Sequence, residues 1–372
     1  MKNKRMRLVM CVVAALLAVA SSSCLRDSAD VGESSGIGRE NVSPRESDTS
    51  ADTTETAETA ETAESDLGTG RETKNNASET EEPPPLDKPD DTVVAKAEWS
   101  VDDGVYTYKF PKRVEKIDLN EMARTSTALF EDQGDDLSAS WYPGKMTYDE
   151  TTGEATASWD RYQSTQDLIR KYHGIYRGDT SRKVCYLTFD CGYEYGPTTD
   201  ILDTLKEKKA PATFFLVSNY VRDDADIVQR MLDEGHIIGN HTKSHKNMTQ
   251  VDAETFIDEL HGLEDIFYEK FPDAEPLMFW RPPQGACNEW VLKLSDMMGY
   301  RTTLWSCAYY DWNVENQKPY DEAISLMKKG LHPGAVYLLH TESTTNAEIL
   351  GELIDYIRAQ GYDILPLCDI AE

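Results

Sequence analysis

Six residues that can take part in metal-assisted acid/base chemistry follow short apolar runs in this chain. They are Asp190, His241, His245, Arg281, Asp311 and His340. Carboxylates and imidazoles can accept and donate protons, and two imidazoles can bind one divalent metal ion. When strands are parallel, the residues that follow them gather at one edge of the sheet. The pattern therefore predicts a catalytic face at the carboxyl ends of parallel strands.

The elements that must position these residues alternate along the chain from residue 166 onward. Apolar runs predict strands at 184–189, 212–217, 236–239, 277–280, 302–307, 335–339 and 363–367. Amphipathic segments predict helices at 198–209, 225–233, 253–270, 289–298, 320–329 and 346–360. Such alternation predicts an α/β fold, and seven strands with this spacing fit a barrel as well as an open sheet.

His241 and His245 lie four residues apart in the segment Asn240–His245. Two imidazoles at this spacing meet on one helical face or in a tight loop, and both can then reach one ion. Many such pairs are ordinary surface or core histidines, so the spacing alone has low specificity. The neighbouring motifs make a metal site the better interpretation.

Five motifs occur in one order between residues 188 and 340. They are TFDCGYE at 188–194, NHTKSH at 240–245, RPPQG at 281–285, WSCAYYDW at 305–312 and LLH at 338–340. Together they resemble the motifs of the NodB-like polysaccharide deacetylases, carbohydrate esterase family 4. The resemblance covers about residues 180–370 and implies a distorted (β/α) barrel that removes N-acetyl groups from a glycan with the help of a metal.

Within this family the chain most resembles the delta-lactam-biosynthetic de-N-acetylases, which act on N-acetylmuramic acid in peptidoglycan. The DxGYE form at 190–194, the lead-in GIYRGD at 174–179 and the sequence WSCAY at 305–309 carry this likeness. Two alternatives stay open. The substrate could be N-acetylglucosamine in peptidoglycan or in a chitin-like glycan, or the chain could be a glycan-binding module without catalysis.

The resemblance implies the roles of the groups that react or bind metal. Asp190 corresponds to the catalytic base, which takes a proton from the attacking water. His340 corresponds to the general acid, which protonates the departing amine. His241 and His245 correspond to ligands of a divalent metal ion that polarises the acetamide carbonyl.

Supporting roles follow from the same resemblance. Arg281 would orient the base, and Asp311 would orient the acid. A backbone N–H near Gln284 would help to hold the oxyanion. Independently of the resemblance, aromatic residues such as Tyr193 and Trp312 cluster around the motifs; they could line a sugar groove, or about half of this cluster could instead be core residues under the barrel rim.

The chain departs from the broad family pattern at two positions. Cys191 replaces a second aspartate that binds metal in most members, and Ala308 replaces the aspartate that usually begins the fourth motif. A Cys191 thiolate as third ligand would favour zinc. If Cys191 instead packs as a thiol, the ion has only two imidazoles and water molecules as ligands, and we expect it to bind weakly.

The first 24 residues have the pattern of an export signal. Four basic residues precede the apolar run Leu8–Ala20, and a small-residue stretch ends at Cys24. This ending resembles a bacterial lipoprotein signal, in which the cysteine becomes the lipidated N-terminus; ordinary cleavage or an uncleaved anchor are the alternatives. We therefore expect an extracytoplasmic protein attached to the outer face of the cell membrane.

Charge divides the rest of the chain. Residues 25–95 are predicted to be a disordered acidic tether, since residues 25–98 hold 20 acidic and 7 basic residues. Subtracting this −13 and the +4 of the signal from the total of −29 leaves −20 for residues 99–372, which argues against nucleic acid as a partner. We expect an N-terminal extension at 96–178 that packs on a deacetylase domain at 179–372.

Overall fold

The computed structural model describes residues 97–113, 137, 141–143, 145–148, 155–159 and 162–370. These residues all belong to one compact unit, Pro83–Glu372. The predicted signal at 1–24 and the predicted tether at 25–95 lie outside the described residues, as does part of the predicted extension at 96–178. No helix among the described residues is both long and apolar enough to span a membrane.

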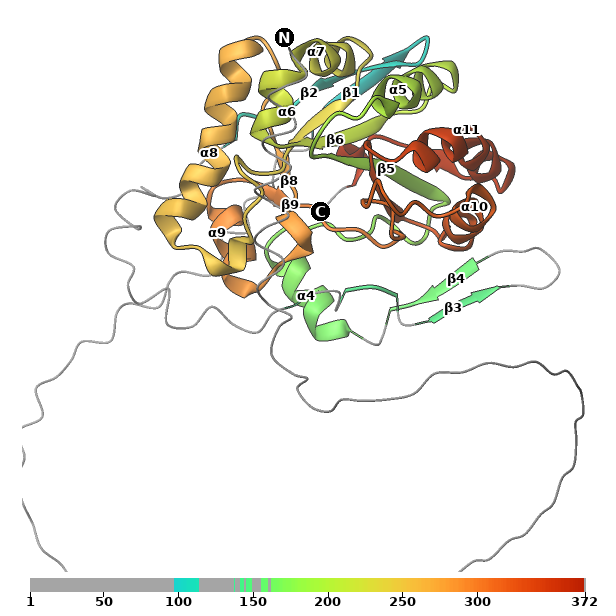
Figure 1. The fold of residues 1–372 in the computed structure, drawn as a ribbon. Helices are drawn as coiled ribbons and strands as arrows, with labels where there is room; N and C mark the ends of the chain where they lie inside the picture. Colours follow the sequence, from blue (N-terminus) through green and yellow to red (C-terminus); the bar gives the residue numbers. More distant parts are fainter. Residues whose placement is uncertain are drawn as a thin grey trace, which may run out of the picture. The chain divides into compact units, whose positions relative to one another are not determined.

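Parallel strands form the central sheet (Figure 1). Their order is β10 (Ala335–His340), β5 (Val184–Cys191), β6 (Ala212–Leu216), β7 (Ile237–Asn240), β8 (Phe279–Trp280) and β9 (Arg301–Thr302), and β11 (Asp363–Ile364) also pairs with β5. Beyond β9 the chain reaches the far edge of the sheet, where Cys307 pairs in parallel with Tyr337 of β10. The Leu338 N–H donates to the Cys307 carbonyl at 2.9 Å. This closure confirms the predicted distorted (β/α) barrel.

Helices connect the strands and lie around the outside of the sheet (Figure 1). They are α4 (Gln163–Lys171), α5 (Pro197–Glu207), α6 (Ser218–Asp223), α7 (Ala225–Asp233), α8 (Ala253–Lys270), α9 (Glu289–Met297), α10 (Tyr320–Lys329) and α11 (Thr344–Ala359). The apolar stripes of these helices pack on the sheet, as Ile201, Leu202 and Leu205 of α5 do. Each predicted helix is present within a few residues of its predicted bounds.

Strand β5 carries side chains of two kinds on its two faces. All eight of its residues are buried. Leu187, Phe189 and Cys191 belong to the core that packs under the helices, whereas Thr188 and Asp190 alternate with them. Because successive side chains of a strand point to opposite faces, Asp190 and Cys191 point away from each other.

Strand β9 is much shorter than the strand predicted at 302–307. The segment after β9 changes its pairing partner, since the Leu304 N–H donates to the Ile175 carbonyl and the Ser306 N–H donates to the Val336 carbonyl of β10. The Arg281 guanidinium also binds this segment. Its Nε donates to the Thr303 carbonyl at 3.1 Å, and its Nη2 donates to the Leu304 carbonyl at 3.4 Å. The segment after β9 therefore bonds to a side chain of the site as well as to neighbouring strands.

The described part of the N-terminal extension contains two antiparallel hairpins. Strands β1 (Glu98–Asp102) and β2 (Val105–Lys109) are joined by a turn whose residues Asp103 and Gly104 have φ values of 47° and 87°. This Asp-Gly pair suits a two-residue hairpin turn with positive φ at both positions. The second hairpin pairs β3 (Lys145–Tyr148) with β4 (Ala155–Ser158).

Trp141 and Tyr142 lie in a turn, between these two hairpins in the sequence. Pro143 follows them and has no N–H with which to continue a strand. The Trp141 side chain is only 1% exposed, and its ring contacts Trp305 edge-on at 5.6 Å. This part of the extension therefore packs on the segment that follows β9.

Candidate active site

The predicted reactive groups meet at the carboxyl ends of the parallel strands. Asp190 is the penultimate residue of β5, and His340 is the last residue of β10. The two residues are register partners, so their backbones are neighbours across the sheet. His241 follows β7 directly, and Arg281 follows β8. The fold thus brings together residues that are up to 150 positions apart in the sequence.

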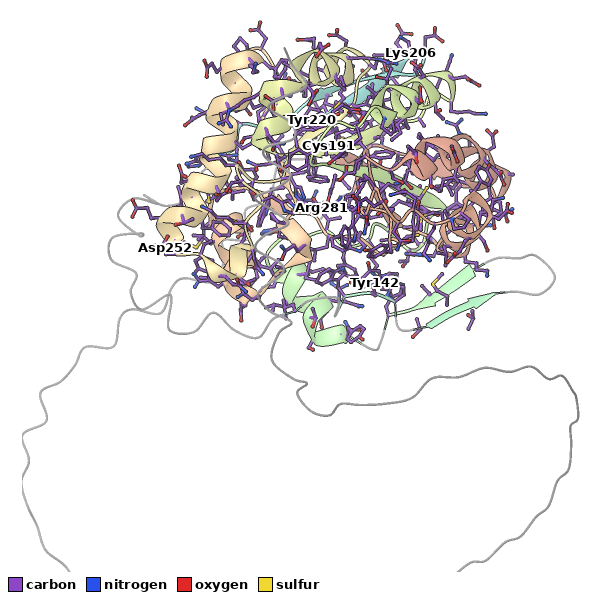
Figure 2. The ribbon with its side chains drawn as sticks, in the orientation of Figure 1. Tyr142, Cys191, Lys206, Tyr220, Asp252 and Arg281 are labelled. Carbon is purple, nitrogen blue, oxygen red and sulfur yellow. The ribbon has the colours of Figure 1, made fainter. Side chains whose placement is uncertain are left out.

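Arg281 is the central cation of the site (Figure 2). Its side chain is fully buried. Its Nη1 donates to Asp190 Oδ1 at 2.6 Å, and its Nη2 donates to Thr188 Oγ1 at 2.7 Å. The guanidinium also stacks on the Phe215 ring, 4.2 Å from the ring centroid. These contacts fix the guanidinium, which in turn fixes the carboxylate of the predicted base.

The environment of Asp190 keeps it ionised although it is buried. Burial alone would raise the pKa of its carboxyl, but nearby positive charge, above all the Arg281 guanidinium, outweighs burial and holds the pKa below its ordinary value. Oδ1 accepts a hydrogen bond from Arg281, and Oδ2 faces Nε2 of His241. A carboxylate in this state can accept a proton at neutral pH.

His241 and His245 lie in a tight loop, which was one of the two arrangements predicted for them. Thr242 and His245 have positive φ values of 71° and 57°. The loop is held because Asn240 Oδ1 accepts from the Thr242 N–H at 2.8 Å and Thr242 Oγ1 accepts from the His245 N–H at 3.0 Å. The two imidazole rings meet edge-on, with their centroids 4.9 Å apart.

The hydrogen bonds of His241 determine which nitrogen could bind a metal. Nδ1 lies 2.8 Å from the Arg281 carbonyl, which can only accept, so Nδ1 carries the proton. Burial lowers the pKa of His241 to about 4, against the opposing attraction of Asp190, so the ring is neutral. The lone pair of Nε2 then lies 3.4 Å from Asp190 Oδ2. Two acceptors that face each other in this way suit a cation.

Cys191 is not brought to this histidine pair. Its side chain is fully buried among apolar residues on the opposite face of β5, near Tyr220 of α6 (Figure 2). Burial raises the pKa of its thiol well above the ordinary value. Among the described residues, no three or more His, Cys, Asp or Glu side chains are grouped so that they could hold a metal ion. The geometry favours the alternative in which Cys191 packs as a thiol.

His340 is held by Asp311 through two hydrogen bonds. Its Nδ1 donates to Oδ1 of Asp311 at 2.8 Å, and its backbone N–H donates to Oδ2 at 2.9 Å. Burial would lower the pKa of His340, but the charge and hydrogen bond of Asp311 raise it to about 9. The imidazole is therefore protonated at neutral pH. Its Nδ1–H is bonded to Asp311, so the proton on Nε2 is the one available for donation.

Two residues of this region were not predicted from the sequence. Asn346 in the first turn of α11 donates to Asp311 Oδ2 at 2.6 Å and to the His340 carbonyl at 3.0 Å. Glu342 lies two residues after the acid, and burial raises the pKa of its carboxyl to about 7. Neither belongs to a motif of several residues, so only their distance of a few positions from His340 could have indicated them.

The predicted substrate contacts lie at the surface around these groups. Tyr193 and Trp312 are 65% and 54% exposed, and the Trp312 ring contacts Tyr310 at 4.7 Å. Gln284 is also exposed and has a φ of 63°. The next residue, Gly285, has no room for a side chain, because an added Cβ would meet the Trp305 ring at 2.5 Å. The loop that carries Gln284 thus packs directly on Trp305.

Comparison with known proteins identifies the family. The model of the polysaccharide deacetylase family matches residues 177–303. The peptidoglycan-N-acetylmuramic acid deacetylase PdaA of Bacillus subtilis (strain 168) is 42% identical over 211 residues, which is 57% of this chain and 80% of that protein. The chain belongs to the polysaccharide deacetylase family. The predicted resemblance to carbohydrate esterase family 4 and the predicted enzyme class are therefore confirmed.

Other relatives agree with this membership of the polysaccharide deacetylases. A chitooligosaccharide deacetylase of Bradyrhizobium sp. (strain ANU 289) is 30% identical over 213 residues, 54% of this chain and 94% of that protein. The solved structure of Bacillus subtilis PdaA, described as a family 4 carbohydrate esterase, matches with a TM-score of 0.55 and 38% identity over 61% of this chain and 95% of that chain. Deacetylases of this family are generally metal-dependent.

Proposed function

We propose that this protein hydrolyses the N-acetyl group of N-acetylmuramic acid in peptidoglycan, which leads to muramic delta-lactam. The observation that carries the proposal is the pair of neighbouring groups with opposite protonation states. Asp190 is held as a carboxylate and His340 as an imidazolium, on register-paired positions of two strands. Amide hydrolysis needs such a pair, because one proton is removed from water and one is given to the leaving nitrogen.

The two groups act in sequence. A water molecule near Asp190 Oδ2 attacks the acetamide carbonyl carbon as the carboxylate takes its proton. The resulting oxyanion is stabilised by a backbone N–H near Gln284. The C–N bond then breaks while His340 gives its Nε2 proton to the nitrogen, so that acetate and a free amine are the products. Arg281 and Asp311 keep the base and the acid oriented throughout.

We propose zinc as the metal. His241 and His245 would hold it, and when bound it would supply Lewis-acid polarisation of the acetamide carbonyl. The free Nε2 of His241, facing a carboxylate oxygen, supports this assignment. Because two imidazoles are a small ligand set, we expect weaker binding than at sites with three protein ligands.

The choice of muramic acid rests on the relatives and on the chain's own motifs. The family member that is 42% identical is a peptidoglycan-N-acetylmuramic acid deacetylase by name. A peptidoglycan-N-acetylglucosamine deacetylase of Bacillus cereus is 32% identical over 201 residues. The DxGYE form at 190–194 carries the chain's resemblance to the muramic acid subgroup, and Ala308 is compatible with that resemblance. Exposed aromatic side chains such as Tyr193 and Trp312 would stack on sugar rings of the glycan strand.

The site of action follows from the N-terminal sequence. We propose that a lipid on Cys24, or an uncleaved signal, attaches the protein to the outer face of the cell membrane. Peptidoglycan lies outside that membrane, so this location would bring the enzyme to its substrate. The net charge of −20 in residues 99–372 supports a partner other than nucleic acid.

Mass spectrometry of peptidoglycan fragments tests the proposed reaction. Fragments are incubated with the full chain, with and without added zinc. We expect loss of one acetyl group from each modified muramic acid residue and no loss with Asp190→Asn, which keeps the shape of the side chain but cannot act as a base. Loss of the acetyl group from glucosamine instead would indicate N-acetylglucosamine as the substrate. No loss from either sugar would favour a glycan-binding module.

A further inference from the structure

A cavity lined by several charged side chains lies at the end of the barrel strands opposite Asp190 and His340. It measures about 490 Å³ and is lined by the segment that leads into β5, the first residue of β9 and residues near position 370. Four arginines line it: Arg170, Arg177, Arg182 and Arg301. Residues 99–372 carry a net charge of −20, so four guanidinium groups around one cavity are an exception to the charge of the domain. Their chemistry is that of an anion-binding site.

Two of these cations share one phenol oxygen. Arg170 Nη1 donates to the Tyr176 hydroxyl at 2.5 Å, and Arg177 Nε donates to the same oxygen at 3.1 Å. The Arg177 guanidinium also stacks on Trp159, 4.2 Å from the ring centroid. Two positive charges held this close together repel each other unless negative charge lies nearby.

The carboxylates around the cavity do not balance its positive charge. Asp179 and Asp369 line the cavity, so four arginines face two carboxylates. Asp369 accepts a hydrogen bond from Arg182 at 2.9 Å, and Asp167 of α4 forms an ion pair with Arg170. Within the part of the chain that the structure describes, Arg177 pairs with no carboxylate. One guanidinium at the cavity therefore lacks a counter-charge from these residues.

The Tyr176 hydroxyl is a further donor whose proton no described residue accepts. A phenol oxygen has two lone pairs, and both accept from arginines here. The hydroxyl proton must then be donated, and none of the described residues accepts it. The Tyr176 side chain is 1% exposed. A buried donor is rarely left unpaired, so this proton indicates an acceptor inside the cavity.

We propose that this cavity binds a phosphate group through Arg170, Arg177 and Tyr176. Guanidinium groups form paired hydrogen bonds with phosphate oxygens, and a phosphate offers enough oxygens for donors that approach from several directions. Free inorganic phosphate and the phosphodiester of an anionic polymer share this chemistry. The inference does not depend on the proposed deacetylation, because the catalytic groups lie at the other end of the strands.

Isothermal titration calorimetry of the full chain tests the proposal. The probes are inorganic phosphate and a short glycerol phosphodiester oligomer, each at constant ionic strength. We expect saturable binding, weakened about tenfold by Arg177→Gln, which loses a charge-assisted hydrogen bond. Tyr176→Phe keeps the ring and loses only the hydroxyl, so it should weaken binding several-fold. Arg222→Gln makes the same charge change at an exposed residue of α6 and should leave the affinity unchanged.

Each result decides the proposal. Saturable binding of either probe, weakened about tenfold in Arg177→Gln and unchanged in Arg222→Gln, supports the site and shows which source of phosphate it accepts. Absence of saturable binding with both probes overturns the proposal, as does equal weakening by the two arginine variants. Circular dichroism and the unchanged deacetylase activity of Arg177→Gln verify that the variant is folded; if it is not, Tyr176→Phe carries the test.

Discussion

At the residue scale, the proposed acid His340 and the proposed base Asp190 would limit the pH range of activity in opposite directions. The acid must be protonated to give a proton, and Asp311 raises its pKa to about 9. The base must be ionised, and its pKa lies below the ordinary value for aspartate. We therefore expect kcat/KM to be high at neutral pH and to fall as the pH rises through about 9. A pH profile of acetate release measures this limb.

Variants of residues near His340 test whether the pKa of His340 causes this fall in activity at alkaline pH, the alkaline limb of the profile. Asp311→Asn removes the charge that raises the pKa of His340, so the limb should move to lower pH, with reduced activity at its maximum. Glu342→Gln removes a weaker contribution to the same pKa and should shift the limb less. An unmoved limb in Asp311→Asn would mean that a group other than His340 gives the proton.

Arg281 couples activity to stability at the same site. Arg281→Met leaves the Asp190 charge buried without its partner, which we expect to cost about 3–5 kcal/mol of unfolding free energy. The double variant with Asp190→Asn should recover part of this loss, because the unpaired charge is then absent. Urea denaturation measures both variants. If Arg281→Met cost less than about 1 kcal/mol, the carboxylate would not depend on the guanidinium.

Cys191 provides a test of the metal ligands. Its side chain points into the core, so Cys191→Ser should leave zinc affinity within about twofold of the parent protein. His245→Ala removes an imidazole and should weaken zinc binding by at least about tenfold. A competition titration with a zinc chelator measures both. Equal losses of zinc affinity in the two variants would indicate that Cys191 is a metal ligand.

Sequence motifs identified residues that the fold brings together, but they did not identify the neighbours of those residues. Asp190, His340, His241 and Arg281 follow strands, and parallel strands gather such residues at one edge. Asn346 contacts the acid only because α11 begins beside β10, and a single asparagine carries no motif. The direction of the Cys191 side chain also depends on the exact end of β5, which apolar runs do not determine.

At the element scale, amphipathic helices were the easiest elements to predict, and short elements were the hardest. The bounds of α7, α8 and α10 equal the predicted ones, because each has a clear apolar stripe. The six-residue helix α6 is too short to show a period and was missed. β9 was predicted too long because the segment after it changes backbone partner, from Ile175 to Val336 of β10, which an apolar run does not reveal.

The same scale gives a prediction for the N-terminal extension. Trp141 is 1% exposed and packs on Trp305, beside the loop that carries Gln284. Trp141→Ala should therefore cost about 3–5 kcal/mol of unfolding free energy. Trp312→Ala, at a side chain that is 54% exposed, should change stability little. Denaturation midpoints compare the two variants. A loss of stability in Trp141→Ala that is as small as the loss in Trp312→Ala would mean that the extension does not stabilise the barrel.

At the scale of the whole molecule, the parallel sheet separates two kinds of polar site. The carboxyl ends of the strands carry Asp190 and His340, and the amino ends carry the arginine-lined cavity. A ligand at one end therefore leaves the other end accessible. An enzyme that works on a wall polymer could in this way hold an anionic polymer at one end while it deacetylates a glycan strand at the other.

The N-terminal sequence predicts that the whole chain is attached to the membrane. If Cys24 is lipidated, Cys24→Ala should move the protein from the membrane fraction to the soluble fraction. A single acyl chain gives only marginal binding, and a lipoprotein anchor carries more than one. Activity on soluble peptidoglycan fragments should stay unchanged, because the proposed catalytic groups lie between residues 190 and 340. Immunoblots of fractionated cells measure the shift. A variant that stays with the membrane would instead indicate an uncleaved signal as the anchor.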